Sequence, residues 1–139
     1  KRNAGKIGLP EVSLGVLPGT GGTQRLARLV GKPRSIEMMT TGATYTFEEA
    51  EKWDLVNHVW DAEGFDVKVM EYARQFVPPN KASKAVGRIK RSVQSGLEVS
   101  FSESLAIERE LQQQLFQSDD AKEGLTAYVE KRPAKFTGK

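Results

Sequence analysis

Cysteine is absent from the 139-residue sequence, and histidine occurs once, as His58. The lack of cysteine excludes disulfide bonds, thiolate nucleophiles and cysteine metal sites, and a single histidine excludes a His-rich metal cluster. Apolar runs are short, and none approaches the roughly 20 residues that a membrane-spanning helix requires. Residues 1–6 also lack the apolar centre of a secretory signal peptide. We therefore expect neither a metal site nor a membrane segment in this chain.

The net charge is also small: 21 Lys and Arg residues and 18 Asp and Glu residues give +3. With 38% apolar and 28% charged residues, the composition is typical of a soluble globular chain. A length of 139 residues suits one domain that buries roughly two-thirds of its unfolded surface. The small positive excess is as compatible with an anionic ligand as with a nucleic acid.

The spacing of apolar residues predicts a chain that changes character along its length. Loose alternation over 6–16 predicts strand, turn and strand, and the proline and three glycines of 17–22 predict a loop. Thr46 with Glu49, and Ser100 with Glu103, have the capping-box pattern that begins a helix. In chain order we expect helices over 23–30, 34–41, 46–53, 64–76, 81–95, 100–117 and 119–131, and a strand over 55–60.

This pattern divides the chain into a mixed strand-and-helix part over 1–61 and an almost purely helical part over 62–139. Two or three short strands cannot form a stable sheet alone, because an exposed edge needs partners. The sequence therefore reads as one that begins in the middle of a larger fold. Trp53 and Trp60 flank the predicted strand and are expected in the core, while His58 is expected to be a packing or surface residue.

The most informative chemical feature is Glu11, which follows Pro10 and stands eight residues before the glycine-rich stretch 19–22. A carboxylate that faces a loop opening a helix is a reasonable acid/base arrangement. Glycines let backbone N–H groups approach a ligand, and a helix N-terminus favours developing negative charge. Taken alone this signal is weak, because most glycine-rich turns only reverse the chain. The loop matches neither the dinucleotide-binding pattern nor the P-loop, since no Lys-Ser/Thr pair follows the glycines.

A resemblance to a known family adds to this reading. The stretches KIGLPEV at 6–12 and PGTGGTQRL at 18–26 resemble the signature of the enoyl-CoA hydratase/isomerase (crotonase) family. The similarity covers essentially the whole chain and is specific to the family rather than to one reaction. It continues through the segments 29–32, 38–42, 47–57, 118–124 and 128–132.

The resemblance implies an α/β fold, with the C-terminal part of a crotonase-like ββα spiral over 1–61 and a helical trimerisation region over 62–139. It also implies an acyl-CoA thioester substrate and a homo-oligomer, either a trimer or a dimer of trimers. No separate cofactor is expected, because coenzyme A enters as part of the substrate. The expected location is the cytoplasm, or the mitochondrial matrix in a eukaryote.

The family stabilises a thioester enolate with two backbone N–H groups, an oxyanion hole. Its hydratases add two carboxylates, one acting on the water and one moving a proton at the carbon next to the carbonyl. By this resemblance Glu11 matches the second carboxylate, and Gly19 matches the glycine whose N–H helps to position the catalytic water. The first carboxylate and both oxyanion donors belong to a stretch of the family pattern that precedes residue 1. We therefore expect residues 1–139 alone to be inactive.

The resemblance assigns substrate binding to Lys131 and Pro18, with Lys131 reaching the coenzyme A moiety. A mobile ammonium group suits a phosphate-bearing ligand. A solvated helix end, favoured by the helix dipole, is a nearly equal alternative for Lys131. The family often has an aromatic residue on the preceding long helix, where this sequence has Gln112, which puts that part of the contact in doubt.

Three functions stay open on the sequence: a hydratase of trans-2-enoyl-CoA, a double-bond isomerase of the same family, and a non-catalytic assembly or RNA-binding module. An isomerase would also keep Glu11 and could dispense with the first carboxylate. RNA binding would use a basic helix face that lacks the aromatic platform of single-strand binders, so we expect no nucleic-acid partner. The basic residues of that face are Lys81, Lys84, Arg88, Lys90 and Arg91.

Overall fold

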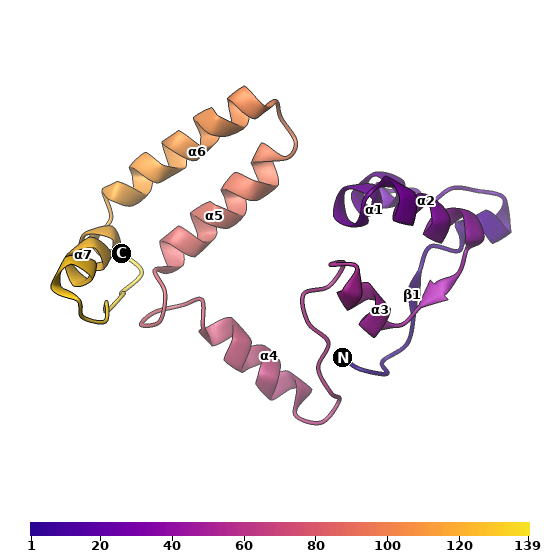
Figure 1. Cartoon of the computed structure of the whole chain (residues 1–139), viewed down its shortest axis with the longest axis horizontal. Helices are drawn as coiled ribbons and strands as arrows, with labels where there is room; N and C mark the ends of the chain where they lie inside the picture. The colour runs from indigo at the N-terminus through magenta and orange to yellow at the C-terminus, as the bar shows by residue number, and fades with distance from the viewer. The chain divides into compact units, whose positions relative to one another are not determined.

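The computed structural model describes all 139 residues, which form two compact units, 1–68 and 69–139 (Figure 1). The first unit holds two short strands, a 3₁₀ helix and three helices, and the helix at the boundary, α4, belongs to both ranges. The bounds are β1 Ile7–Gly8, η1 Glu11–Leu14, α1 Gly22–Val30, α2 Lys32–Thr41, β2 Thr44–Tyr45, α3 Phe47–Lys52, α4 Phe65–Arg74, α5 Ser83–Gly96, α6 Phe101–Phe116 and α7 Asp119–Glu130.

The only sheet is an antiparallel pair in which Ile7 of β1 lies opposite Tyr45 of β2, and Gly8 lies opposite Thr44. The strand predicted at the end of 6–16 is wrong, because Glu11–Leu14 forms the 3₁₀ helix η1 instead. The alternating apolar residues of this segment do not form a buried face, since Leu14 is 80% exposed and Val16 57% exposed. Gly15, at φ 71°, ends the turn in the left-handed region.

The strand predicted over 55–60 is also wrong, because this segment runs as turns and irregular backbone. Asp54 adopts a left-handed φ of 58°, which reverses the chain after α3. The N–H of Val59 donates to the Glu51 carboxylate at 2.9 Å rather than to a neighbouring strand. Val59 is nevertheless buried, so the apolar residues here serve the core without forming a ladder.

Each predicted helix is present, with ends displaced by a few residues. Both capping boxes are confirmed. The Glu49 N–H donates to Thr46 Oγ1 at 3.2 Å, and the Glu49 carboxylate accepts from the Thr46 N–H at 2.8 Å. The equivalent distances for Ser100 and Glu103 are 3.4 and 2.9 Å. These local bonds satisfy backbone donors that a helix start leaves free, which is why the pattern marks helix starts in the sequence.

The core of the first unit is small. It consists of the buried side chains of Pro18, Leu26, Ser35, Met38, Ala50 and Val59. The two tryptophans expected there are only half-buried. The ring of Trp53 lies edge-on to Tyr45 with 4.8 Å between centroids and has the Arg34 guanidinium 4.5 Å from its own centroid. Trp60 stacks on His58 at 5.5 Å, and His58 itself is exposed.

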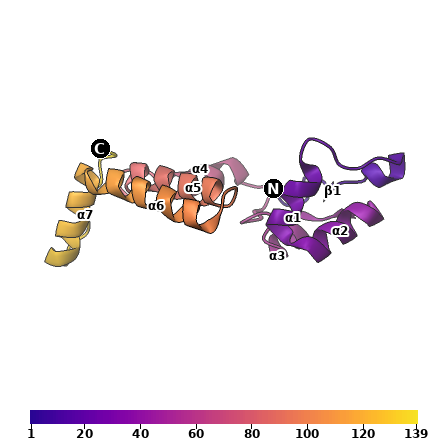
Figure 2. The same ribbon diagram turned by 90° about the horizontal axis from the view of Figure 1, so that it is seen from above.

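In the second unit α5 and α6 form a hairpin, and the two helices lie side by side in both views (Figures 1 and 2). Leu111 of α6 and Ala127 of α7 are its buried apolar residues, and Ser118 and Asp120 are its buried polar ones. None of the helices combines the length and the apolar character needed to cross a membrane. On α5 the side chains of Lys84, Lys90 and Arg91 are exposed.

Candidate functional site

Glu11 is the first residue of η1, directly after β1 and the Leu9-Pro10 step. Pro10 has its φ fixed by its ring, and its carbonyl accepts the Ser13 N–H at 2.9 Å, which begins the turn. The Glu11 carbonyl accepts the N–H of Val16 at 3.3 Å, and the Val12 carbonyl accepts that of Gly15 at 3.0 Å. The backbone around Glu11 is therefore held by its own short-range bonds.

The Glu11 carboxylate has one buried oxygen, Oε2, that accepts no hydrogen bond from the chain. It is the only buried side-chain polar atom of the chain in this condition. A buried acceptor without a partner costs about 1–3 kcal/mol, so folded proteins seldom keep one without a use. Within the chain, this oxygen is therefore a buried acceptor with no assigned partner.

The glycine-rich loop is fixed beside the segment that leads into Glu11. Pro18 is buried, and Gly22, at the start of α1, lies against it. A Cβ added to Gly22 would be 2.8 Å from Pro18 Cβ and 3.8 Å from Leu9 Cδ1. The loop, the first turn of α1 and the residues before Glu11 therefore converge at Gly22.

Within this loop Gly19 is exposed, and its N–H donates to no acceptor of the chain. Its carbonyl is occupied, because it accepts the Gly22 N–H at 3.0 Å and the Thr20 hydroxyl at 2.8 Å. A Cβ added to Gly19 would meet no atom within 4 Å. The backbone at Gly19 thus presents an accessible donor in open space, as a water- or ligand-binding N–H requires.

The C-terminal end of α2 is the neighbour of η1 on its other side. Gly42 follows α2 with φ 62° and ψ 17°. A Cβ there would be 3.0 Å from Val12 Cγ1, 3.4 Å from Ser13 Oγ and 3.6 Å from Pro10 Cα. Sequence reasoning identified Gly42 only as the end of a helix, and nothing local in the sequence shows what it packs against.

Lys131 lies in the second unit, as the residue that ends α7. It is exposed and has a left-handed φ of 55°, and its N–H donates to the Tyr128 carbonyl at 3.3 Å. No hydrogen bond or ion pair is made by its ammonium group. The structure thus brings Glu11, Pro18 and Gly19 into one unit and places Lys131 in the other.

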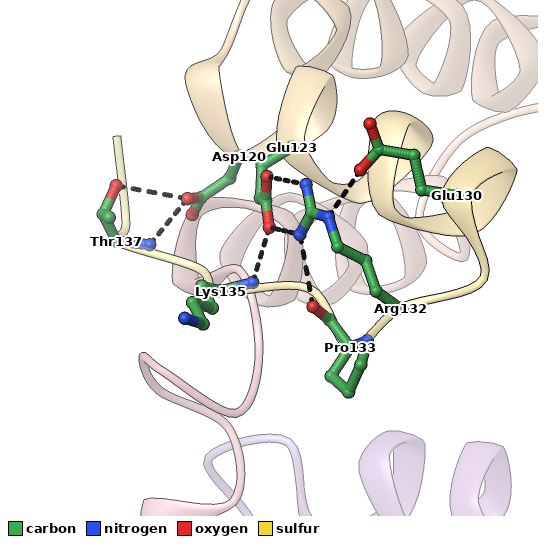
Figure 3. A network of polar contacts seen from close by, with 7 residues as sticks. All are labelled: Asp120, Glu123, Glu130, Arg132, Pro133, Lys135 and Thr137. Atoms are coloured by element: carbon green, nitrogen blue, oxygen red, sulfur yellow. Dashed lines mark hydrogen bonds and ion pairs between the residues drawn. The ribbon is translucent and has the colours of Figure 1, made fainter.

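The residues on both sides of Lys131 are held by a network of carboxylates on α7, which we call the tail clasp (Figure 3). Arg132 forms a two-pronged ion pair with Glu123 at 2.7 and 2.9 Å and also binds Glu130 at 2.6 Å. Glu123 accepts the Lys135 N–H at 2.8 Å. Asp120, 2% exposed, accepts the N–H groups of Thr137 and Gly138 at 2.7 and 2.8 Å (the latter bond is not drawn).

The clasp perturbs both members of its central pair. The Arg132 guanidinium, and then the Lys135 N–H, lower the pKa of Glu123 from 4.5 to about 2. The hydrogen bonds that Arg132 donates to Glu123 in turn raise the pKa of Arg132. Sequence reasoning missed this network, because nine residues separate Glu123 from Arg132 and no motif links them.

Beside the clasp, α5, α6 and α7 surround an open apolar pocket of about 390 Å³. Gln112 lies on its wall, at the position where the family pattern often has an aromatic residue, together with Lys84, Phe116 and Phe136. No group of three His, Asp or Glu side chains comes close enough together to hold a metal ion.

The chain is similar in sequence and in fold to known proteins. The sequence profile of the enoyl-CoA hydratase/isomerase family matches residues 1–139. A crystal structure of an enoyl-CoA hydratase from Geobacillus kaustophilus superimposes with a TM-score of 0.90 at 49% identity, covering 99% of this chain and 52% of that one. The fold is therefore that of the C-terminal part of crotonase-fold enzymes.

Curated relatives agree. The mitochondrial enoyl-CoA hydratase of Pongo abelii is 36% identical over 127 residues, which are 91% of this chain and 43% of that protein. A Mycobacterium bovis protein named as a probable enoyl-CoA hydratase is 39% identical over 132 residues, 95% of this chain and 51% of that protein. The chain spans about half the length of the curated relatives it matches, and it belongs to the enoyl-CoA hydratase/isomerase family.

Proposed function

We propose that the full-length protein is an enoyl-CoA hydratase, which adds water reversibly to a trans-2-enoyl-CoA through a thioester enolate. The observation that carries this proposal is the buried, unpartnered Oε2 of Glu11. Relatives named as enoyl-CoA hydratases support it. The substrate would bring coenzyme A with it, and we expect no separate cofactor.

In the proposed reaction, the water oxygen bonds to C3 and loses one of its protons, a proton is added at C2, and the C2–C3 double bond becomes a single bond. The negative charge that develops on the thioester oxygen is the charge that an oxyanion hole stabilises. Glu11 would move the proton at C2, because one of its oxygens is committed to no other partner. The free N–H of Gly19 would orient the water, and Lys131 would approach a phosphate of coenzyme A.

The second candidate is a double-bond isomerase of the same family, which moves a proton between C2 and C4 and adds no water. Glu11 favours both reactions, since a single carboxylate can carry the proton in each. The two are separated by assaying crotonyl-CoA for hydration and a 3-enoyl-CoA for conversion to its 2-enoyl isomer. The bacterial cytoplasm or the mitochondrial matrix remains the expected location.

The direct test is Glu11→Gln in the full-length protein. The amide keeps the shape of the side chain but cannot carry the proton, so we expect turnover to fall by ~10²–10⁴-fold with coenzyme A thioester binding nearly unchanged. Glu37→Gln is the matched control, because Glu37 is an exposed carboxylate of the same unit, paired with Arg34 at 3.5 Å. Rates on crotonyl-CoA within about threefold of wild type for Glu11→Gln would refute the role of Glu11.

A further inference from the structure

We propose that Gly42 is a positioning residue for Glu11: its lack of a side chain lets η1 lie against the end of α2, and this contact fixes where the carboxylate is held. The inference rests on the proposed role of Glu11 in proton transfer. It concerns a residue that contacts neither the substrate nor the water and acts only through η1.

The first argument is the tightness of the contact. A Cβ on Gly42 would be 3.0 Å from Val12 Cγ1, which is closer than ordinary van der Waals contact, and 3.6 Å from the backbone at Pro10. Val12 follows Glu11 directly, and Pro10 precedes it. An added methyl group would therefore press on Val12, the residue next to the carboxylate, while only touching Pro10 on its other side.

A second glycine shows that two whole segments approach each other closely here. A Cβ on Gly8 would be 2.7 Å from the Ala43 carbonyl oxygen. Gly8 also pairs with Thr44 across the two-stranded sheet. The two segments thus meet backbone to backbone at Gly8 and residues 43–44, and Gly42 then meets the Val12 and Ser13 side chains of η1. We call this contact the glycine seam.

The seam has a large influence on Glu11 because it is the contact of η1 with another helix, whereas the hydrogen bonds around Glu11 are short-range bonds within the turn. The helix has four residues, none of them buried. Val12 is 43% exposed and Leu14 is 80% exposed, so no apolar core anchors the turn. A shift at the seam would therefore move Glu11 rather than be absorbed, and a displacement of about 1 Å at a reacting group can lower a rate by ~10²-fold.

The test compares Gly42→Ala with Gly64→Ala in the full-length protein. Both glycines have a left-handed φ, 62° and 66°, so both alanines carry a similar backbone penalty. Only at Gly42 does the new Cβ meet a neighbour, since Gly64 has nothing within 4 Å. We expect Gly42→Ala to lower kcat about 10- to 100-fold with KM changed less than about threefold. Gly64→Ala should shift the thermal midpoint similarly and leave kcat near wild type.

Trimming the opposing side chain provides the rescue. Val12→Ala removes the atom that the new Cβ would meet, so the variant that carries both Gly42→Ala and Val12→Ala should regain much of the lost kcat. A loss that came only from the left-handed backbone of the alanine at position 42 would not be rescued, because Val12→Ala leaves the φ of residue 42 unchanged.

Three results would overturn the inference. They are an equal loss of kcat in the two alanine variants, a loss confined to KM, and no recovery in the double variant. Failure of the proposed function gives a different result, because Glu11→Gln would then retain activity in the same assay. In that case the role of Gly42 would be refuted as well.

Discussion

At Gly19 the proposed functional group is the backbone N–H. The N–H is exposed and unused by the chain, while the carbonyl is held by two hydrogen bonds. The open space around the residue means that its side chain can be changed without a steric conflict. A substitution can therefore test the proposed role of the N–H without the added side chain meeting a neighbour.

We predict that Gly19→Pro lowers hydration about tenfold in the full-length protein, because the substitution deletes one N–H donor and a neutral hydrogen bond contributes about 0.5–1.5 kcal/mol. Gly19→Ala keeps the donor and is the comparison. The measurement is kcat on crotonyl-CoA, with thermal midpoints to show that both variants fold. Equal activities for the two variants would contradict a role of the N–H.

At the scale of the element, α7 is joined to the tail that follows it by carboxylates as well as by the ring of Phe136, which lies over Gly124. Glu123 binds Arg132 and the Lys135 N–H, and Asp120 binds the N–H groups at 137 and 138. Because the pKa of Glu123 is lowered from 4.5 to about 2, its contribution to tail order is complete above about pH 4.5 and is lost as the pH falls toward 2. In the sequence, Lys131 lies between Glu123 and Arg132, the central pair of the tail clasp.

We predict that Glu123→Gln loosens the tail at neutral pH and that this difference from wild type shrinks as the pH is lowered. Hydrogen exchange of residues 132–139, followed by mass spectrometry from pH 6 downward, measures the difference directly. Glu110→Gln is the control, because Glu110 is an exposed carboxylate of α6 that accepts a hydrogen bond from Gln114 at 3.0 Å and takes no part in the clasp. A difference that stays constant with pH would contradict the assignment to the Glu123 charge.

At the scale of the whole molecule, the second unit leaves apolar side chains uncovered. Leu125, Tyr128 and Val129 of α7 are 58%, 84% and 78% exposed, and Phe101 at the start of α6 is 78% exposed. Leu111, in contrast, is buried inside the unit. Apolar groups exposed together favour association, and the family resemblance suggests a trimer or a dimer of trimers.

We predict that the full-length protein is oligomeric in solution and that Val129→Glu shifts it toward smaller species. Thr126→Glu places the same charge on an exposed position of the same helix and should leave the assembly intact. Light scattering at micromolar concentration gives the mass of each species. A wild-type monomer, or equal dissociation by both variants, would contradict an interface through this face of α7.

The sequence by itself determined the features that depend on near neighbours. The helices predicted over 23–30 and 34–41 are present as 22–30 and 32–41 and are followed by Gly31 and Gly42. The two capping boxes start α3 and α6, because a helix end is satisfied by residues within one turn. The position of Glu11 before a glycine-rich loop was likewise readable from the motif. The family follows from this same stretch together with its continuation along the chain.

Only the tertiary structure decided the features that need distant partners. The segment after Pro10 became a 3₁₀ helix rather than a strand because its one sheet partner, Thr44–Tyr45, reaches no further than Gly8. No local pattern in the sequence relates Gly42 to Val12 or Glu123 to Arg132. The burial of the Glu11 oxygen likewise depends on residues that are distant in the sequence. Burial and close approach are set by what folds against a residue, and that information is spread over the whole chain.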